Sequence, residues 1–104
     1  MATVKIRNSF KTAYNRISDY GKIKFGNAVA EKLDRKLFSV ITQLQRFPQS
    51  APREPILKNF GREYHSIMLH KHYKVIYYYV QTTDIVVLTT IWDMRTSTQK
   101  HLPL

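Results

Sequence analysis

The spacing of apolar residues changes once along this chain, and that change limits what the chain can fold into. Through the first half, apolar side chains recur every three or four residues, which is the period of a helix with one buried face. Beyond Gly61 they recur every second residue, which is the period of a half-buried strand. Helices that precede the strands, rather than alternate with them, predict an α+β fold in which a helical layer covers a sheet.

The first residues predict one strand and one helix. Residues Thr3–Arg7 alternate between polar and apolar side chains and are expected to form a short strand. Asn8 or Ser9 follows, and a short side-chain oxygen at this place caps a helix by accepting from free backbone N–H groups. Gly21 is the expected end of this first helix, because glycine readily takes the conformation of a C-terminal cap.

A longer second helix is predicted from Lys24 to Arg46. Its apolar residues form a single stripe, and a proline shortly after Arg46 ends the helix. The stripe comprises Val29, Leu33, Leu37, Val40, Ile41 and Leu44. Neither helix is expected to be stable by itself, so the two should form an antiparallel hairpin that needs a sheet to cover its apolar side.

Three more strands are predicted after a proline-rich connector. They cover Glu63–His70, Tyr73–Val80 and Asp84–Trp92, and they are rich in aromatic and β-branched residues. The short breaks between them indicate an antiparallel meander. The expected order is therefore β-α-α-β-β-β, with the helical hairpin packed on a small antiparallel sheet in a single domain over residues 1–104.

The charge of the chain narrows its partners. Lys and Arg number 17 against 7 Asp and Glu, which gives a formal net charge of +10. The first 46 residues hold ten basic and three acidic residues, hence +7, and the remainder holds seven and four, hence +3. Such a field favours polyanionic partners: nucleic acid, the ribosome, an anionic membrane or an acidic protein. The alternative to polyanion binding is that the basic surface only keeps the chain soluble. The net charge, however, exceeds the magnitude of about 2–8 that is usual for the solubility of a small domain.

Several classes of protein find no support in the sequence. The chain has no cysteine, which excludes a disulfide framework and suits a reducing cytoplasm. No apolar segment of a signal peptide follows Lys5 and Arg7, and no apolar run approaches the roughly 18 residues of a membrane helix. His70 and His72 lie at a predicted turn with no third ligand near them. We therefore expect a cytoplasmic protein without metal, cofactor or membrane partner.

Two short motifs in the strand half carry a resemblance to a known family. One predicted strand contains Tyr73-Lys74-Val75-Ile76-Tyr77, and the last strand ends as Trp92-Asp93-Met94-Arg95. With these motifs, its element order, its length and its basic composition, the chain resembles the RelE/ParE superfamily of toxins from type II toxin–antitoxin systems. It is most similar to the plasmid-stabilisation-like members, and the resemblance covers roughly Val4 to Leu102.

The resemblance implies a growth-arresting toxin that a cognate acidic antitoxin neutralises within a toxin–antitoxin hetero-oligomer. Such an antitoxin typically wraps a flexible acidic segment around its toxin, where charge steers it and apolar grooves hold it. RelE-like relatives cleave mRNA in the ribosomal A site without a metal, whereas ParE-like relatives block DNA gyrase and need only a binding surface. The sequence leaves open whether the target is the ribosome with its mRNA or DNA gyrase. It therefore also leaves open whether the chain is an enzyme, namely a ribosome-dependent endoribonuclease.

The ribonuclease branch assigns possible roles to four residues. Its chemistry removes a proton, stabilises charge on a phosphate and protonates the leaving oxygen. By resemblance, Lys74 lies near the scissile phosphate, Arg95 stabilises the transition state, and His101 is a C-terminal general acid or base. His65 falls near one of two second-strand lysines of that branch, and Ile67 takes the place of the other. An isoleucine holds neither a proton nor a phosphate, so this departure favours the ParE-like branch.

These residues also have purely structural interpretations. Lys74 can be a solvated strand residue, and Arg95 can pair with Asp93. Residues Tyr77–Tyr79 can stack nucleic-acid bases, but strand alternation turns at least one of them into the core. The toxin interpretation requires the helices to cover one face of the sheet. It also requires Lys74 and Arg95 to gather positive charge on the other, open face.

A different class of function is also compatible with the charge. A basic nucleic-acid-binding module without toxicity would bind with steep salt dependence, because neutralised phosphates release their counterions. The sequence contains no helix-turn-helix, zinc-finger or glycine-rich phosphate motif that would specify such a module. We keep this module as the alternative to the toxin.

Overall fold

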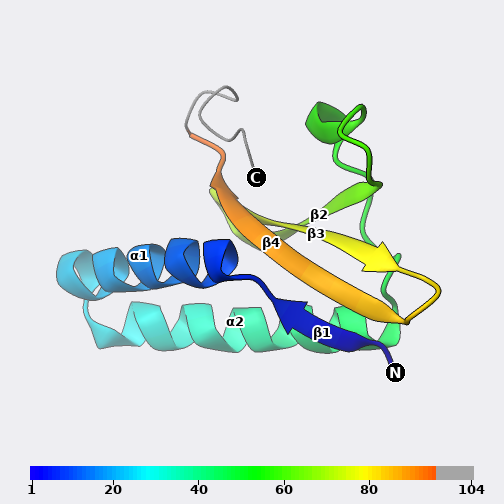
Figure 1. Ribbon diagram of the computed structural model, residues 1–104. Coiled ribbons are helices and arrows are strands. Elements are labelled where there is room, and N and C mark those ends of the chain that lie inside the picture. The colour runs from blue at the N-terminus through cyan, green and yellow to red at the C-terminus, as the bar shows by residue number, and fades with distance from the viewer. Residues whose placement is uncertain (96–104) are drawn as a thin grey trace.

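The computed structural model describes residues 1–95 and arranges them as a helical layer beside a sheet (Figure 1). The elements are β1 (Thr3–Ile6), α1 (Asn8–Phe25), α2 (Asn27–Arg46), the 3-10 helix η1 (Pro55–Leu57), β2 (Tyr64–His70), β3 (Tyr73–Val80) and β4 (Ile85–Asp93). This succession confirms the predicted α+β fold and its β-α-α-β-β-β order. Within residues 1–95, no helix is both long and apolar enough to cross a membrane.

The sheet holds four strands in the order β1-β4-β3-β2. Strands β2, β3 and β4 pair in antiparallel register, which confirms the predicted meander. Strand β1 instead lies parallel to β4 at one edge, where the Thr3 and Arg7 N–H groups donate to the carbonyls of Asp84 and Leu88. The sheet is therefore mixed, and the prediction of a wholly antiparallel sheet was wrong. Alternation within a short strand does not encode the direction of a partner at the far end of the chain.

The two helices form the expected hairpin, but the break between them falls at Gly26 and not at Gly21. Gly26 has a φ of +89°, a conformation that favours glycine, and it ends α1 after Phe25. Gly21 lies inside α1 and faces α2, where an added Cβ would lie 3.5 Å from Val29 Cγ1. The predicted end of the first helix was therefore wrong. The second helix accordingly begins at Asn27, three residues later than expected.

The start of α1 is fastened to the sheet and is not capped by a side chain. Arg7 directly precedes the helix, and its side chain makes no capping hydrogen bond. The Ser9 hydroxyl instead donates to the carbonyl oxygen of Thr89 at 2.5 Å, which joins α1 to β4. The prediction of an Asn8 or Ser9 cap was therefore wrong, because the helix already begins at Asn8 and Arg7 stands at the capping position.

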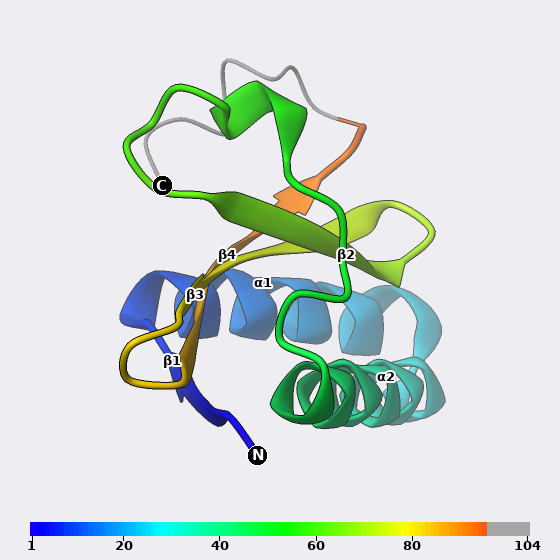
Figure 2. The same cartoon turned by 90° about the vertical axis from the view of Figure 1, so that its right-hand side faces the viewer.

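The helical hairpin and the sheet form two layers, as Figure 2 shows, and the main core lies between them. Alternate residues of β3 and β4 meet the apolar stripes of both helices there. Its most deeply buried members include Phe10, Val40, Leu44, Val75, Tyr77, Val86 and Leu88. Burial of the Tyr77 ring in this core confirms that at least one of the three consecutive tyrosines is a packing residue.

A smaller core lies on the opposite face of the sheet. Leu57 of η1, Ile76 of β3 and Trp92 of β4 form it, with Ile56 and Tyr64 packed against them. In Figure 2 the connector between α2 and β2 passes up one side of the sheet to this face, away from the helices. Part of the face that the sequence predicted to be open is therefore covered by the connector.

Candidate functional site

Lys74 lies on the connector side of the sheet in an ion pair with Glu54. Its ammonium group contacts Glu54 Oε1 and lies 5.5 Å from the centroid of the Trp92 ring. The exposed fraction is 13% for the Lys74 side chain and 1% for that of Glu54. The other carboxylate oxygen of Glu54 accepts from the Ile56 N–H at 3.1 Å, so the pair also anchors η1. Lys74 is therefore neither a solvated residue nor a free cation.

The ion pair with Lys74 helps to lower the pKa of Glu54. Burial alone would raise that pKa, because a charged carboxylate is disfavoured away from water. The hydrogen bonds from Lys74 and from the Ile56 N–H outweigh burial and hold the pKa below its usual value. Glu54 therefore stays ionised and neutralises the charge of Lys74. The sequence analysis missed Glu54, because nothing in the connector indicates that it reaches a strand twenty residues later.

Arg95 lies on the other side of the sheet. Its Nε and Nη2 donate to the two Asp93 carboxylate oxygens, each at 3.0 Å, and Nη2 also donates to the Tyr73 hydroxyl at 3.1 Å. The hydrogen bond from Arg95 lowers the pKa of Asp93. The Arg95 side chain is 52% exposed, which confirms both the predicted exposure and the predicted pair with Asp93.

The two motif cations lie on opposite faces of the sheet. Tyr73 and Lys74 are neighbours in β3, so their side chains point to opposite sides, and Arg95 bonds to Tyr73. The expectation that Lys74 and Arg95 share the open face was therefore wrong. After β4 the chain turns, with the Met94 N–H donating to the His72 carbonyl at 2.6 Å and the Arg95 N–H to Asp93 Oδ1 at 3.0 Å. This turn directs Arg95 to the helix side.

Of the two histidines with a possible ribonuclease role, His65 and His101, only His65 lies within the described residues. His65 is 6% exposed and stacks on Tyr77 with ring centroids 5.4 Å apart. Its two ring nitrogens bond the Ala51 carbonyl oxygen at 2.8 Å and Glu63 Oε2 at 3.1 Å. His65 is thus packed against the main core with both ring nitrogens hydrogen-bonded, and it lies apart from Lys74 and Arg95. His101 lies outside the described residues.

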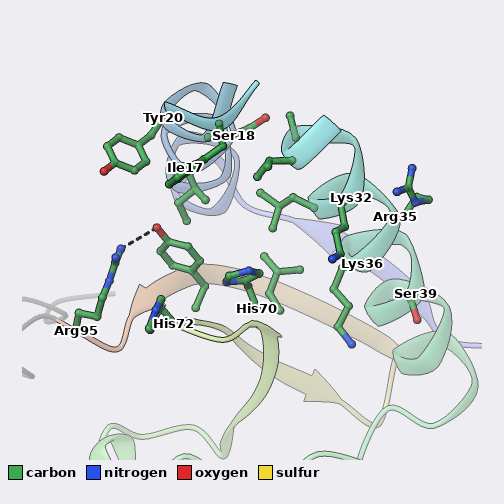
Figure 3. Close-up of a pocket in the computed structure, with 17 residues that line it drawn as sticks. Ile17, Ser18, Tyr20, Lys32, Arg35, Lys36, Ser39, His70, His72 and Arg95 are labelled. Carbon is green, nitrogen blue, oxygen red and sulfur yellow. Dashed lines mark hydrogen bonds between the residues drawn. The ribbon is translucent and has the colours of Figure 1, made fainter. Parts of the chain in front are cut away.

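The structure contains a cleft that sequence reasoning did not identify (Figure 3). It has a volume of about 820 Å³ and opens between the helical hairpin and the end of the β2–β3 hairpin. Its apolar walls include Ile17, Val29, Leu33, Leu69 and Tyr73. Its cationic and imidazole groups are Lys32, Arg35, Lys36, His70, His72 and Arg95. No acidic residue of the described chain lines it.

The walls and charges of this cleft suit a particular kind of ligand. Phe25 and Val29 at its mouth are 67% and 41% exposed, so apolar surface is left uncovered there. An uncovered apolar surface rimmed by polar groups is typical of an interaction site. Lys32, Arg35 and Lys36 on the α2 side carry positive charge, which would favour an acidic ligand. Lys32 and Lys36 repeat at helical spacing beside the apolar stripe of α2, and this spacing is the sequence signal that could have indicated the surface.

The described residues offer no metal centre. No group of three or more His, Asp or Glu side chains within residues 1–95 is arranged to hold a metal ion. His70 and His72, the close pair at the β2–β3 turn, have ring centroids 6.3 Å apart and line the cleft.

Comparisons with known proteins agree with this architecture. The chain matches the family model of the ParE toxin of the type II toxin–antitoxin system parDE over residues 4–97. No curated protein matches it in sequence. A chain of the chromosomal ParDE system from P. aeruginosa aligns with a TM-score of 0.69 at 15% identity, covering 89% of this chain and 96% of that one. The isolated E. coli RelE toxin aligns with a TM-score of 0.58 at 14% identity, covering 97% and 93%.

A metal-bound toxin from Helicobacter pylori is also similar, with a TM-score of 0.66 at 13% identity, covering 91% of this chain and 97% of that one. At such low identities the structural likenesses establish the fold alone. The family model matches nearly all of the chain and includes both strand motifs that the sequence analysis singled out. The chain therefore belongs to the ParE toxin family of type II toxin–antitoxin systems.

Proposed function

We propose that this toxin arrests growth by binding DNA gyrase and blocking it, with no catalytic step of its own. One observation carries the choice of target. Lys74, Arg95 and His65, which the ribonuclease mechanism would bring together, lie in three separate environments. Cleavage without a metal needs a proton acceptor, a proton donor and phosphate-binding cations around one phosphate group. A blocking protein needs only a complementary surface.

The state of Lys74 adds to this argument. A lysine paired with a buried carboxylate offers little net positive charge to a phosphate group. Moving it toward a substrate would leave Glu54 charged and buried, and breaking a buried ion pair in this way costs about 3–5 kcal/mol. Ile67 stands where the ribonuclease branch has a second lysine, and it is half-buried against the main core. Both facts favour gyrase over the ribosome as the target.

The partner that restrains the toxin follows from the cleft. The proposed antitoxin is acidic, and the cleft pairs apolar walls with a rim of Lys32, Lys36 and Arg95. An amphipathic acidic segment that folds on binding would bury its apolar side chains there and place its carboxylates at the rim. We infer a toxin–antitoxin hetero-oligomer held together at this cleft. We also infer a cytoplasmic location, because gyrase acts on the chromosome.

Two assays run side by side test the target. The purified protein is added to a gyrase supercoiling reaction and, separately, to ribosomes translating a defined mRNA whose ends are mapped. The proposal predicts loss of supercoiling and intact mRNA. Cuts in codons at the ribosomal A site, with normal supercoiling, would establish the ribonuclease instead.

Growth assays test the broader class. Induction of the toxin should stop growth, and co-expression of a short acidic gene from the neighbouring reading frame should restore it. Unimpaired growth despite abundant soluble protein would contradict a toxin. It would favour the basic nucleic-acid-binding module.

A further inference from the structure

A row of side chains crosses the face of the sheet that is turned away from the helices. Lys5 of β1 is in register with Val87 of β4, Val87 with Tyr78 of β3, and Tyr78 with Tyr64 of β2. Directly paired residues share a face, so the row presents one basic and two aromatic side chains side by side. The rings of Tyr64 and Tyr78 pack edge to face with centroids 5.8 Å apart.

Two arginines converge on the middle of this row. Arg62 lies over the Tyr78 ring with its guanidinium carbon 4.2 Å from the ring centroid. The guanidinium carbon of Arg7 lies 5.7 Å from the same centroid, and its Nη2 donates to the Tyr78 hydroxyl at 3.1 Å. Tyr78 is 7% exposed, so its ring serves as a fixed support for both cations and is not itself open to a ligand.

Among the described residues, these arginines differ from Lys74 and Arg95 in having no acidic partner. Lys74 is paired with Glu54 and Arg95 with Asp93. Within residues 1–95, neither Arg7 nor Arg62 takes part in an ion pair. Holding two positive charges at one ring with no counter-charge is unfavourable, and a bound anion removes that cost.

The start of α1 increases the positive potential at this place. Arg7 immediately precedes α1, whose first turn contains no acidic residue and has no side-chain cap. The first N–H groups of a helix lack partners within it and carry partial positive charge. The helix terminus thus adds partial positive charge next to Arg7.

We propose that Arg7 and Arg62 bind the phosphate groups of a nucleic-acid strand laid along this face of the toxin. A guanidinium donates two parallel hydrogen bonds to phosphate, and aromatic stacking presets its orientation. Tyr78 and Val87, which lie in the same row, are 7% and 9% exposed, so these two side chains offer little apolar surface to a ligand. Binding here would therefore rest on phosphate contacts and would be independent of base sequence. An acidic protein segment finds its apolar walls in the cleft on the other side of the sheet.

This site is separate from the one proposed for the antitoxin. The arginines lie on the face opposite the helices, whereas the cleft lies between the helices and the sheet. The toxin would then be able to hold DNA while its cleft is occupied. The inference does not depend on gyrase as the target, since a phosphodiester strand would bind the isolated toxin.

Fluorescence anisotropy with a labelled twelve-nucleotide oligo(dT) tests the proposal over a range of salt concentrations. Replacing both arginines, Arg7→Gln with Arg62→Gln, should weaken binding about tenfold or more, because each removes hydrogen bonds to a charged group. The slope of log affinity against log salt should fall by about 1.4, if each arginine neutralises one phosphate of a single strand. A matched control, Arg16→Gln with Lys24→Gln, removes the same charge from exposed positions of α1 and should change affinity much less.

Three outcomes would overturn the proposal. The first is an equal loss in both double variants, which would indicate only general attraction to a basic protein. The second is unchanged binding when both arginines are replaced. The third is competition by poly-glutamate as strong as competition by oligo(dT), which would indicate an acidic peptide as the ligand. Competition with oligo(rU) and a DNA duplex of equal length then distinguishes RNA, single-stranded and double-stranded sources of phosphate.

Tyr78→Phe gives a second measurement that does not depend on folding of the arginine variants. It keeps the ring that supports Arg62 and removes the hydroxyl that holds Arg7. Affinity for oligo(dT) should fall about threefold, with the melting temperature close to that of the unaltered protein. An unchanged affinity would contradict the positioning role of this hydroxyl and, with it, the two-arginine site.

Discussion

The two sides of β3 treat their motif cations in opposite ways. On the connector side, Lys74 is bound to the buried carboxylate of Glu54 and belongs to a closed structural cluster. On the helix side, Arg95 is 52% exposed, bonds to Tyr73 and lines an open cleft. Tyr73 and Lys74, adjacent in β3, therefore face an open cleft and a closed cluster, respectively. The comparison teaches that a family motif fixes a residue's place along a strand, while the segment packed beside it decides whether its charge is available.

The two ion pairs should also differ in how much they contribute to the free energy of folding. A buried ion pair holds its partners firmly, because removal of one leaves the other charged and without water. An exposed pair is screened by solvent and contributes little to folding. Changes on the connector side should therefore alter stability, and changes on the helix side should alter binding.

Lys74→Met should produce the largest change in stability. Methionine keeps much of the volume of lysine but leaves the Glu54 carboxylate buried at 1% exposure. Loss of one partner of a buried pair costs about 3–5 kcal/mol, and this is the decrease expected in the free energy of unfolding by urea. The double change Lys74→Met with Glu54→Gln should recover more than half of it, because the glutamine oxygen can still accept from the Ile56 N–H. A single variant as stable as the unaltered protein would show that the pair is not a structural anchor.

A smaller effect should appear as a dependence of stability on pH. The folded-state pKa of Glu54 lies below the ordinary value of 4.5, since hydrogen bonds from Lys74 and the Ile56 N–H outweigh its burial. A lowered folded pKa means that this contribution to stability is complete above about pH 4.5 and is lost as the pH falls through the folded pKa. The Lys74→Met, Glu54→Gln double variant should lose less stability than the unaltered protein on acidification below pH 4.5. Equal losses of stability in the two proteins would show that a group other than Glu54 is responsible for the pH dependence.

The order of helices and strands could be predicted because each depends on a local pattern. The apolar stripe of Lys24–Arg46 and the alternation of Tyr73–Val80 mark their elements before any tertiary contact exists. Two boundaries could not be predicted in this way. Ser9 donates to a strand eighty residues later, and the choice between Gly21 and Gly26 as the helix end depends on how the helices pack. These positions are decided by partners that a local pattern does not contain.

The candidate site was less predictable than the fold for the same reason. The alternation of β3 places Lys74 and Tyr73 on opposite sides. The side that Arg95 takes is set by a turn beyond the strand, and the neutralisation of Lys74 by Glu54 comes from an irregular connector. Neither the turn nor the connector carries a periodic signal. The charge of each residue was visible in the sequence, but its availability was not.

Of these variants, Arg95→Ala should change stability the least. Its main effect should be on the inhibition of gyrase. Its guanidinium is half exposed and pairs with Asp93 at the surface, so the free energy of unfolding should stay close to that of the unaltered protein. If gyrase contacts the cleft that the antitoxin would cover, loss of a charged hydrogen-bond donor there should weaken the toxin about tenfold, measured as the concentration that halves gyrase supercoiling. The matched control is the Lys74→Met, Glu54→Gln double variant, which should inhibit gyrase as well as the unaltered protein. Inhibition that fails with the double variant but survives Arg95→Ala would reverse the assignment of the two sides, because it would place the working cation in the cluster that we interpret as structural.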